Sequence, residues 1–301
     1  MGRAMAEVFP VARDVFNTAD AALAGDARAL SKLCFEGPIE ELTLTANTQP
    51  AIVATSIACL AALRARLPSL EAAMMSGHSL GEYSALVASG ALDLADTIRL
   101  VRLRGQAMQE SVPSGEGAMA AIMGLDAAAV EAVCEQTRVA MPGRTVSAAN
   151  FNAPGQVVIA GHADAVAAAS ASVAERKGKA IALKVSAPFH CALMRPAAAR
   201  LALALEPVGI APLGCPVVAN FTGEANLDPA RVPALLVDQV AGTVRWDQCV
   251  RTMVAAGIET FVEIGPGKVL AGLIRRIHKP AVVHNVSDPA SLEVVVAALG
   301  G

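Results

Sequence analysis

A serine framed by glycines is the first candidate for chemistry. Ser79 lies at the centre of Gly77–Gly81, which fits the GxSxG pattern between an apolar run and an expected helix. The glycines allow a sharp strand-to-helix turn that exposes the serine hydroxyl, and the helix start places backbone N–H groups near it. The pattern predicts a nucleophile. The competing interpretation is a glycine-rich turn with an incidental serine.

A nucleophilic serine needs a base, and His190 is the best placed of the five histidines. An expected strand breaks at Pro188, just before it, so the imidazole can lie at a strand end beside the nucleophile. His162 and His278 lie at an expected loop and helix end, without such a context. His78 is expected to line the nucleophile turn rather than to act as the base. A core or surface histidine is the alternative for His190.

Arg104 points to a negatively charged substrate. On the helix expected from about Leu94 to Glu110, positions 97, 100, 101, 104 and 108 share one stripe that is mostly apolar. Arg99 and Arg102 project elsewhere. An arginine on such a stripe needs a partner, and its guanidinium can bind a carboxylate through two hydrogen bonds. A structural salt bridge, or a side chain that reaches the surface, would also explain it.

The elements that must position these residues alternate between helix and strand. Helical pattern dominates the first 70 residues, and one helix is expected to carry Pro50 in its first turn and to end near Arg66. Between about 117 and 185 the expected order is β-α-β-β-α-β, that of a ferredoxin-like subdomain. Further helices are expected at 80–88, 94–110, 192–205, 232–240 and 268–277, and further strands at 216–220 and 260–264.

These elements predict an α/β fold with two parts. A hydrolase-like parallel-sheet domain would comprise residues 1–114 and 187–301, with a ferredoxin-like subdomain, residues 115–186, inserted into it. The active site is expected in the cleft between them. The composition agrees, because 54% hydrophobic residues with only 3% aromatics suit buried parallel strands covered by alanine-rich helices.

Bulk properties exclude several classes of protein. No apolar run of ~18 residues lacks charges or breakers, and the start lacks the apolar core of a secretory signal, so we expect a cytoplasmic protein with no membrane partner. A net charge of −3 argues against nucleic-acid binding. The six cysteines are scattered without a CxxC pair, so we expect buried, reduced thiols and no metal site or cofactor.

Together these segments resemble bacterial malonyl-CoA:acyl-carrier-protein transacylases. Gly77–Leu86 resembles the nucleophile motif of that family, Leu103–Glu110 its carboxylate-binding arginine segment, and Phe189–Met194 its base motif. Asn150–Gly161 and Val262–Leu270 are similar to two further signatures. The likeness covers nearly the whole chain in the right order.

The resemblance implies a role for each matching residue. Ser79 would attack the malonyl thioester while His190 accepts its proton. Gln239 matches the position whose backbone carbonyl orients that histidine, giving a dyad without a carboxylate. The Leu80 N–H would stabilise the oxyanion, and Arg104 would hold the malonyl carboxylate.

The resemblance also implies a reaction sequence and partners. Coenzyme A would leave, and the phosphopantetheine thiol of the acyl carrier protein would attack the malonyl-serine in a ping-pong cycle, so malonyl-CoA is a substrate and not a cofactor. Phe189 resembles a bulky residue that would crowd a 2-methyl branch, and His78 and Asn150 are expected to contact the substrate. We expect a monomer. Acidic carrier proteins would dock on four basic residues, unless these form an ordinary solvated face: Lys268, Arg275, Arg276 and Lys279.

One departure concerns the start of the chain. Members of the family begin with a strand and a glycine-glutamine-rich loop that gives a second backbone oxyanion donor, and Met1–Arg3 matches the stretch just after that loop. We therefore expect either that the start codon lies upstream of Met1 or that turnover is impaired by the loss of half the oxyanion hole.

Three other functions compete with malonyl transfer in fatty acid biosynthesis. A trans-acting acyltransferase of a polyketide synthase would use the same chemistry with another carrier. A serine esterase shares GxSxG, but it usually has an HGGG-like loop, which this chain lacks, and it has no need for Arg104. A non-catalytic scaffold protein is the third alternative, and the presence of Ser79, His190 and Arg104 together speaks against it.

Overall fold

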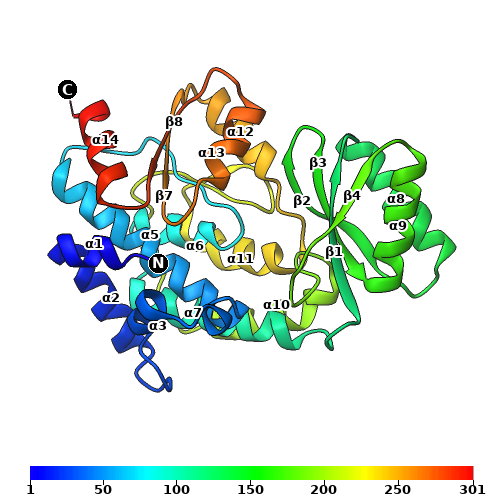
Figure 1. Ribbon diagram of the computed structural model, residues 1–301, viewed down its shortest axis with the longest axis horizontal. Coiled ribbons are helices and arrows are strands. Elements are labelled where there is room, and N and C mark those ends of the chain that lie inside the picture. The colour runs from blue at the N-terminus through cyan, green and yellow to red at the C-terminus, as the bar shows by residue number, and fades with distance from the viewer. Residues whose placement is uncertain (301) are drawn as a thin grey trace.

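The N-terminal part of the molecule is helical, as the sequence predicts. The structure is a computed structural model and describes residues 1–300. Figure 1 shows the first helices packed together at one end of the molecule, beside the C-terminal helix α14. These helices are α1 (Arg3–Val8), α2 (Pro10–Ala22), α3 (Leu30–Glu36), α4 (Ile39–Leu42) and α5 (Thr45–Arg66).

Helix α5 begins earlier than predicted. It starts at Thr45, so Pro50 lies inside the helix and not in its first turn. The first turn is already fixed upstream, because the N–H groups of Asn47 and Thr48 both donate to the Leu44 carbonyl. Proline at position 50 removes only one N–H from the helix, the one that would face the Ala46 carbonyl.

The same helix is long and apolar enough to cross a membrane by length and composition alone, although the sequence analysis discounted any such run. Its most apolar window is 61% buried inside the fold. Helices α2 and α7 (Leu94–Glu110) pack against it. This burial accounts for its apolar composition.

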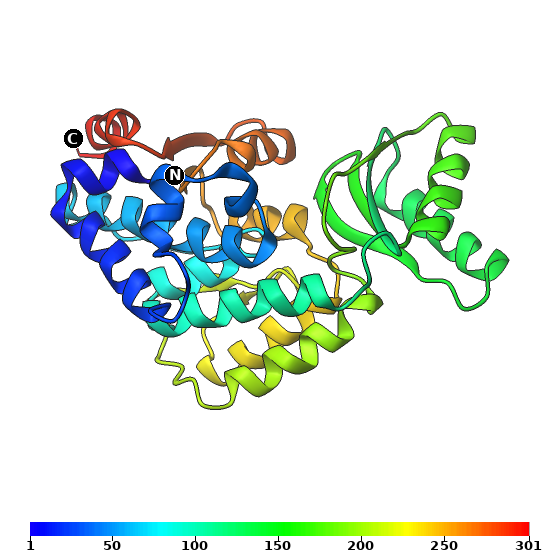
Figure 2. The same cartoon turned by 60° about the horizontal axis from the view of Figure 1, so that its bottom comes forward.

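Helix α7 leads into a four-stranded antiparallel sheet with its own core. The strand order is β2-β3-β1-β4, and the core includes Ile122, Val130, Ile159 and Val173. Figure 2 shows this unit set apart from the larger helical part. Its elements are β1 (Gly117–Met123), α8 (Ala127–Ala140), β2 (Val146–Ala153), β3 (Gln156–His162), α9 (Ala163–Glu175) and β4 (Lys179–Ala182).

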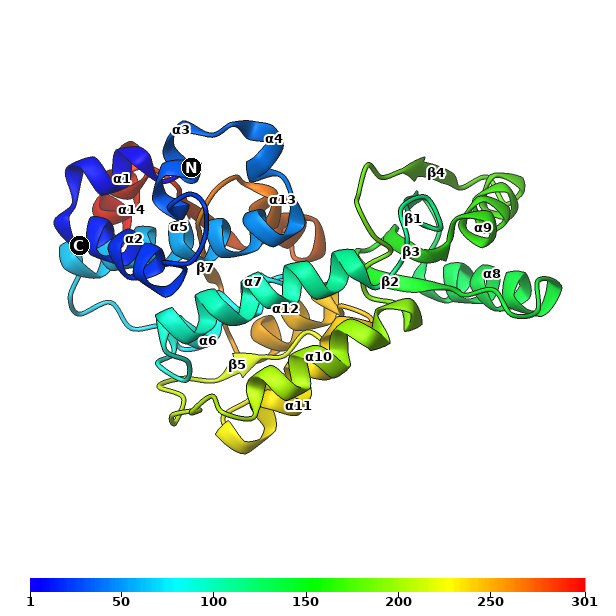
Figure 3. The same ribbon diagram turned by 90° about the horizontal axis from the view of Figure 1, so that it is seen from below.

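The chain then returns to the larger part through α10 (Arg195–Leu205), which packs beside α7 (Figure 3). Parallel pairing in the larger part of residues 1–300 is confined to β7 with β8 and a bridge between Met75 and Val217. The α/β class is confirmed. The remaining elements are α6 (Gly81–Ala88), β5 (Val217–Val218), β6 (Ala225–Asn226), α11 (Val232–Ala241), α12 (Trp246–Ala255), β7 (Thr260–Ile264), α13 (Val269–Ile277), β8 (Val282–Val286) and α14 (Pro289–Leu299).

All six cysteines are free, and all but Cys215 are buried, as the sequence predicts. Burial raises the pKa of their thiols, to about 12 for Cys59 and Cys249. Each thiol therefore stays protonated at neutral pH.

Candidate active site

The nucleophile turn has the strained geometry that its sequence predicts. Ser79 has a φ of 48°, a left-handed conformation that a residue with a side chain rarely adopts. Helix α6 begins two residues later, with Leu80 as its N-cap. A Cβ at Gly77 would overlap the backbone of Gly81, so only glycine fits there. The turn exposes the Ser79 hydroxyl to the residues that surround it.

Ser79 and His190 form a hydrogen-bonded pair. Ser79 Oγ lies 2.7 Å from His190 Nε2, and His190 Nδ1 lies 2.8 Å from the backbone oxygen of Gln239. A carbonyl oxygen can only accept, so Nδ1 carries the proton and Nε2 is free to accept one from the serine. This places the backbone carbonyl of Gln239 where the family resemblance implies, in the position that a carboxylate occupies in a triad.

Arg104 lies at the same point, buried and without a carboxylate partner. Its side chain is only 2% exposed, its guanidinium donates to Ser79 Oγ at 3.0 Å, and it donates to Gln49 Oε1 at 2.8 Å. Helix α7 can approach α5 this closely because of Gly105, where a Cβ would lie 2.7 Å from the Ala46 Cα. Within residues 1–300 Arg104 makes no salt bridge, and burial excludes a side chain that reaches the surface. A guanidinium held in this way is suited to bind a carboxylate brought by a ligand.

The side chain of Gln239 connects these groups, which the sequence analysis did not foresee. Its Nε2 donates to the Ser79 carbonyl at 2.9 Å and to Glu82 Oε2 at 2.8 Å, while its Oε1 accepts from Arg104 at 3.0 Å. Glu82 is also buried, and desolvation raises its pKa to about 7. Gln239, Glu82 and Arg104 are therefore joined with Ser79 in one hydrogen-bond network.

The environment keeps His190 in the form that a base requires. Desolvation by burial, followed by the positive charge of Arg104, lowers the pKa of His190 to about 3. A histidine accepts a proton only in its neutral form. Because the pKa is lowered, the neutral form persists as the pH falls through 6.5 and is lost only near the lowered pKa.

We therefore expect the reactivity of Ser79 to lack an acid limb near pH 6.5. The rate of Ser79 modification by a fluorophosphonate is measured against pH. Protonation of His190 should lower this rate by less than about twofold between pH ~7.5 and ~5.5. The same profile on Glu82→Gln removes the titration of Glu82 from the comparison. A midpoint near 6.5 in both proteins would show that His190 has an ordinary pKa.

The Leu80 N–H lies at the start of α6, directly after the nucleophile. Within residues 1–300 it donates to no other protein atom, whereas the next N–H, of Gly81, donates to the His78 carbonyl. A free N–H at a helix start beside the serine is suited to receive a developing negative charge.

The other residues expected to contact substrate are His78, Asn150 and Phe189. His78 Nε2 lies 2.8 Å from Asn152 Oδ1, so the residue of β2 that meets the turn directly is Asn152, which the sequence analysis missed. Asn150 is buried on the same strand, where its backbone pairs with Val244. Phe189 is half-buried and packs against both the main core and a cluster of the small sheet. These residues lie where the small sheet meets the larger part.

The four basic residues expected to dock a carrier protein are all exposed, but they are not equivalent. Arg275 donates to the Val283 carbonyl at 2.7 Å, within the fold. Arg276 donates to Gln156 Oε1 of β3 at 3.1 Å. Lys268 and Lys279 complete the group at the two ends of α13.

Comparisons with known proteins identify the family of the chain. The acyl transferase domain family matches residues 1–296. The malonyl CoA-acyl carrier protein transacylase of Bacillus subtilis is 43% identical over 99% of this chain and 92% of its own length. An acyl carrier protein S-malonyltransferase of Vibrio cholerae superposes with a TM-score of 0.93, at 43% identity over 98% of this chain and 94% of that one.

A third comparison concerns a complex. A malonyl-transacylase solved with a type II polyketide synthase acyl-carrier protein superposes with a TM-score of 0.92, at 40% identity, over 99% of this chain and 94% of that one. The resemblance drawn from the motifs is confirmed over nearly the full length. The chain belongs to the acyl transferase family and resembles its malonyl CoA-acyl carrier protein transacylases.

Proposed function

We propose that this chain transfers malonyl from malonyl-CoA to the phosphopantetheine thiol of an acyl carrier protein, in fatty acid biosynthesis. The observation that carries the proposal is the buried guanidinium of Arg104, 3.0 Å from Ser79 Oγ and without a carboxylate of its own. A serine esterase has no use for such a group beside its nucleophile. An acyl donor that ends in a carboxylate, as malonyl does, supplies the missing partner.

The geometry supports a two-step transfer. His190 Nε2 accepts the hydroxyl proton as Ser79 Oγ attacks the thioester carbonyl, and the Leu80 N–H donates to the resulting oxyanion. The intermediate collapses, coenzyme A leaves with the proton held by His190, and malonyl remains on Ser79. The carrier thiol then gives its proton to His190 and attacks the malonyl ester, and the proton returns to Ser79 as the product thioester leaves.

The finer description of the fold belongs to this proposal. Residues 1–114 and 187–301 would form a hydrolase-like domain, and residues 115–186 an inserted ferredoxin-like subdomain. The strand order β2-β3-β1-β4 and the return of the chain beside α7 support the insertion. The hydrogen bond between His78 and Asn152 supports a site between the two parts. We place the protein in the cytoplasm, where its carrier and coenzyme A occur.

The direct test uses radiolabelled malonyl-CoA. Incubation with the protein should give one covalent label, mapped by mass spectrometry to Ser79, and addition of holo acyl carrier protein should move the label to the phosphopantetheine. Hydrolysis of p-nitrophenyl esters without malonyl transfer would favour the esterase. Absence of both activities in folded protein would favour a scaffold.

A carrier from a polyketide synthase is the second candidate. The complex of a similar malonyl-transacylase with a type II polyketide synthase acyl-carrier protein favours it. Comparing kcat/KM for a fatty acid synthase carrier and a polyketide synthase carrier, each in its holo form, distinguishes the two.

Charge reversal should weaken the encounter with the carrier. Arg276→Glu combined with Lys279→Glu should raise the KM for an acidic carrier several-fold at low salt and leave kcat unchanged, because both residues contribute to a positive face that attracts acidic partners. The effect should shrink as salt is added. Lys32→Glu, on the exposed side of α3, is the matched control. An equal KM for the double variant and this control would show an ordinary solvated face.

A further inference from the structure

A buried carboxylate follows the nucleophile by three residues and makes no salt bridge with any residue in the range 1–300. Glu82, in the first turn of α6, is 2% exposed. Its Oε2 accepts from the backbone N–H of Asn220 at 2.9 Å and from Gln239 Nε2 at 2.8 Å. The transfer reaction described above gives this group no role.

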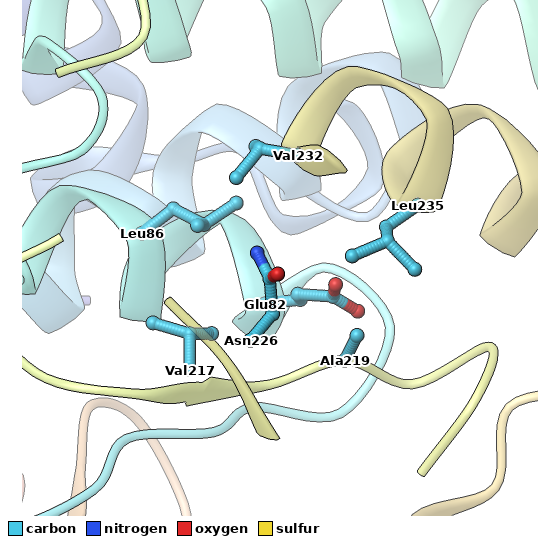
Figure 4. A pocket seen from close by; sticks show the side chains of 7 residues that line it. All are labelled: Glu82, Leu86, Val217, Ala219, Asn226, Val232 and Leu235. Carbon is cyan, nitrogen blue, oxygen red and sulfur yellow. The ribbon is translucent and has the colours of Figure 1, made fainter. Parts of the chain in front are cut away.

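The surroundings of Glu82 are otherwise mostly apolar, so its carboxyl group depends on these two hydrogen bonds. The carboxyl group lies at a cavity of about 10 Å³, and the other side chains that line it are Asn226 and apolar residues (Figure 4). Such a volume holds one water at most. A buried carboxyl without such partners would be costly. The Glu82 carboxyl therefore fixes the positions of the Asn220 backbone N–H and of Gln239 Nε2. The apolar members of the lining are Leu86, Val217, Ala219, Val232 and Leu235.

Asn220 fastens the nucleophile turn on both sides of Ser79. Its side chain is fully buried, just after β5. Its Oδ1 accepts from the Ser79 N–H at 2.6 Å, and its Nδ2 donates to the Gly77 carbonyl at 2.9 Å. The left-handed backbone of Ser79 is strained, so it persists only where its surroundings fix it.

Glu82 also decides which way the amide of Gln239 points. The nitrogen of this amide faces two acceptors, Glu82 Oε2 and the Ser79 carbonyl, while its oxygen faces the Arg104 guanidinium. Without an acceptor at Glu82, one N–H of Gln239 loses its partner and the preference for this orientation weakens. The backbone carbonyl of the same residue holds His190, so a shift of Gln239 reaches the base.

We propose that Glu82 and Asn220 are positioning residues. Glu82 acts as a hydrogen-bond acceptor that fixes Asn220 and Gln239. These two residues in turn hold Ser79 and His190 in the relative position that the reaction requires. The acceptor function does not need a full negative charge, because one oxygen of a protonated carboxyl or of an amide can accept both hydrogen bonds. Glutamine at this position should therefore act nearly as well as glutamate.

The test compares Glu82→Met, which removes the acceptor but keeps the length of the side chain, with Glu82→Gln. The readouts are the rate of Ser79 modification by a fluorophosphonate, and kcat and KM for malonyl-CoA, in protein shown to be folded by circular dichroism. For Glu82→Met we expect about a 10- to 100-fold loss in the fluorophosphonate rate and in kcat, with little change in KM, because misplacement of reacting groups slows chemistry more than binding. Glu82→Gln should stay within about threefold of the wild type.

Ser84→Ala is the matched control, because the Ser84 hydroxyl is buried on the same helix and has no hydrogen-bond partner within residues 1–300. Wild-type reactivity in folded Glu82→Met would overturn the proposal, and so would a Glu82→Gln protein as slow as Glu82→Met. If Glu82→Met does not fold, Asn220→Ala tests the turn from the side of β5, with the same loss expected and an unchanged rate contradicting it. The inference rests on the Ser79–His190 pair of the proposed function. The fluorophosphonate needs no malonyl group, so its outcome is separate from that of the malonyl-transfer test.

Discussion

Replacement of Ser79 by alanine should abolish covalent labelling by malonyl-CoA and reduce transfer on the order of 10⁶-fold. The reason is that the hydroxyl supplies the attacking oxygen, so no malonyl-serine can form without it. Its Oγ lies within hydrogen-bond distance of both His190 and Arg104, so the substitution removes the centre of the arrangement. Mass spectrometry of the labelled protein and a carrier-malonylation assay measure the two effects.

Ser84→Ala provides the comparison on the same helix. It removes a hydroxyl that has no hydrogen-bond partner in the described part of the chain, so its activity should remain near that of the wild type. A label found on a cysteine, or retained after Ser79→Ala, would contradict the assignment of the nucleophile.

Replacement of Arg104 by alanine should change which acyl group the protein prefers. Malonyl transfer should fall by about 10- to 150-fold, which corresponds to the loss of roughly 1.5–3 kcal/mol for a hydrogen bond to a charged group. Acetyl transfer should fall less or rise, because a buried guanidinium that acetyl cannot pair is removed. The ratio of kcat/KM for malonyl-CoA and acetyl-CoA measures the effect.

The same helix supplies the control for this experiment. Arg99 is exposed and, among residues 1–300, pairs only with Asp96 at the surface, so Arg99→Ala should leave the ratio unchanged. Equal losses for malonyl and acetyl in Arg104→Ala would show that Arg104 supports the structure of the site and does not select the substrate.

The proximity of Ser79 and His190 could be predicted from the sequence because its signals are local. The glycines around Ser79 and the broken strand before His190 are visible within a few residues. The stripe that carries Arg104 follows from helical periodicity, and the structure places Leu100, Val101 and Met108 in the core beside it. The burial of Arg104 without a carboxylate could not be foreseen, because it depends on which side chains α5 and α11 bring to it.

The supporting network could not be predicted for the same physical reason. Asn220 contacts a residue 141 positions away, and the Gln49–Arg104 hydrogen bond joins residues 55 positions apart. Neither contact leaves a periodic pattern. One signal was present for Asn220: a polar residue at the carboxyl end of an expected strand is a frequent place for functional groups. Gln49 gave no such signal, because the sequence places it only beside the proline of an expected first turn.

Several elements were also missed. The sequence analysis predicted neither α12 nor the C-terminal pair of β8 and α14. Strand β8 is short and half-exposed, so its apolar pattern is weak, and it is fixed by parallel pairing with β7. Pairing of this kind depends on tertiary contacts that sequence windows do not contain.

The burial of the cysteines has a consequence for the fate of the acyl group. A malonyl thioester can be lost to any accessible thiolate by thioester exchange, since the thiolate is the reactive form of cysteine. Cys191 directly follows the base, yet its thiol is buried, donates to the Pro188 carbonyl at 3.1 Å and has a pKa raised to about 11. A buried, protonated thiol is a poor nucleophile, so Cys191 does not compete with an incoming carrier thiol for an acyl group on Ser79.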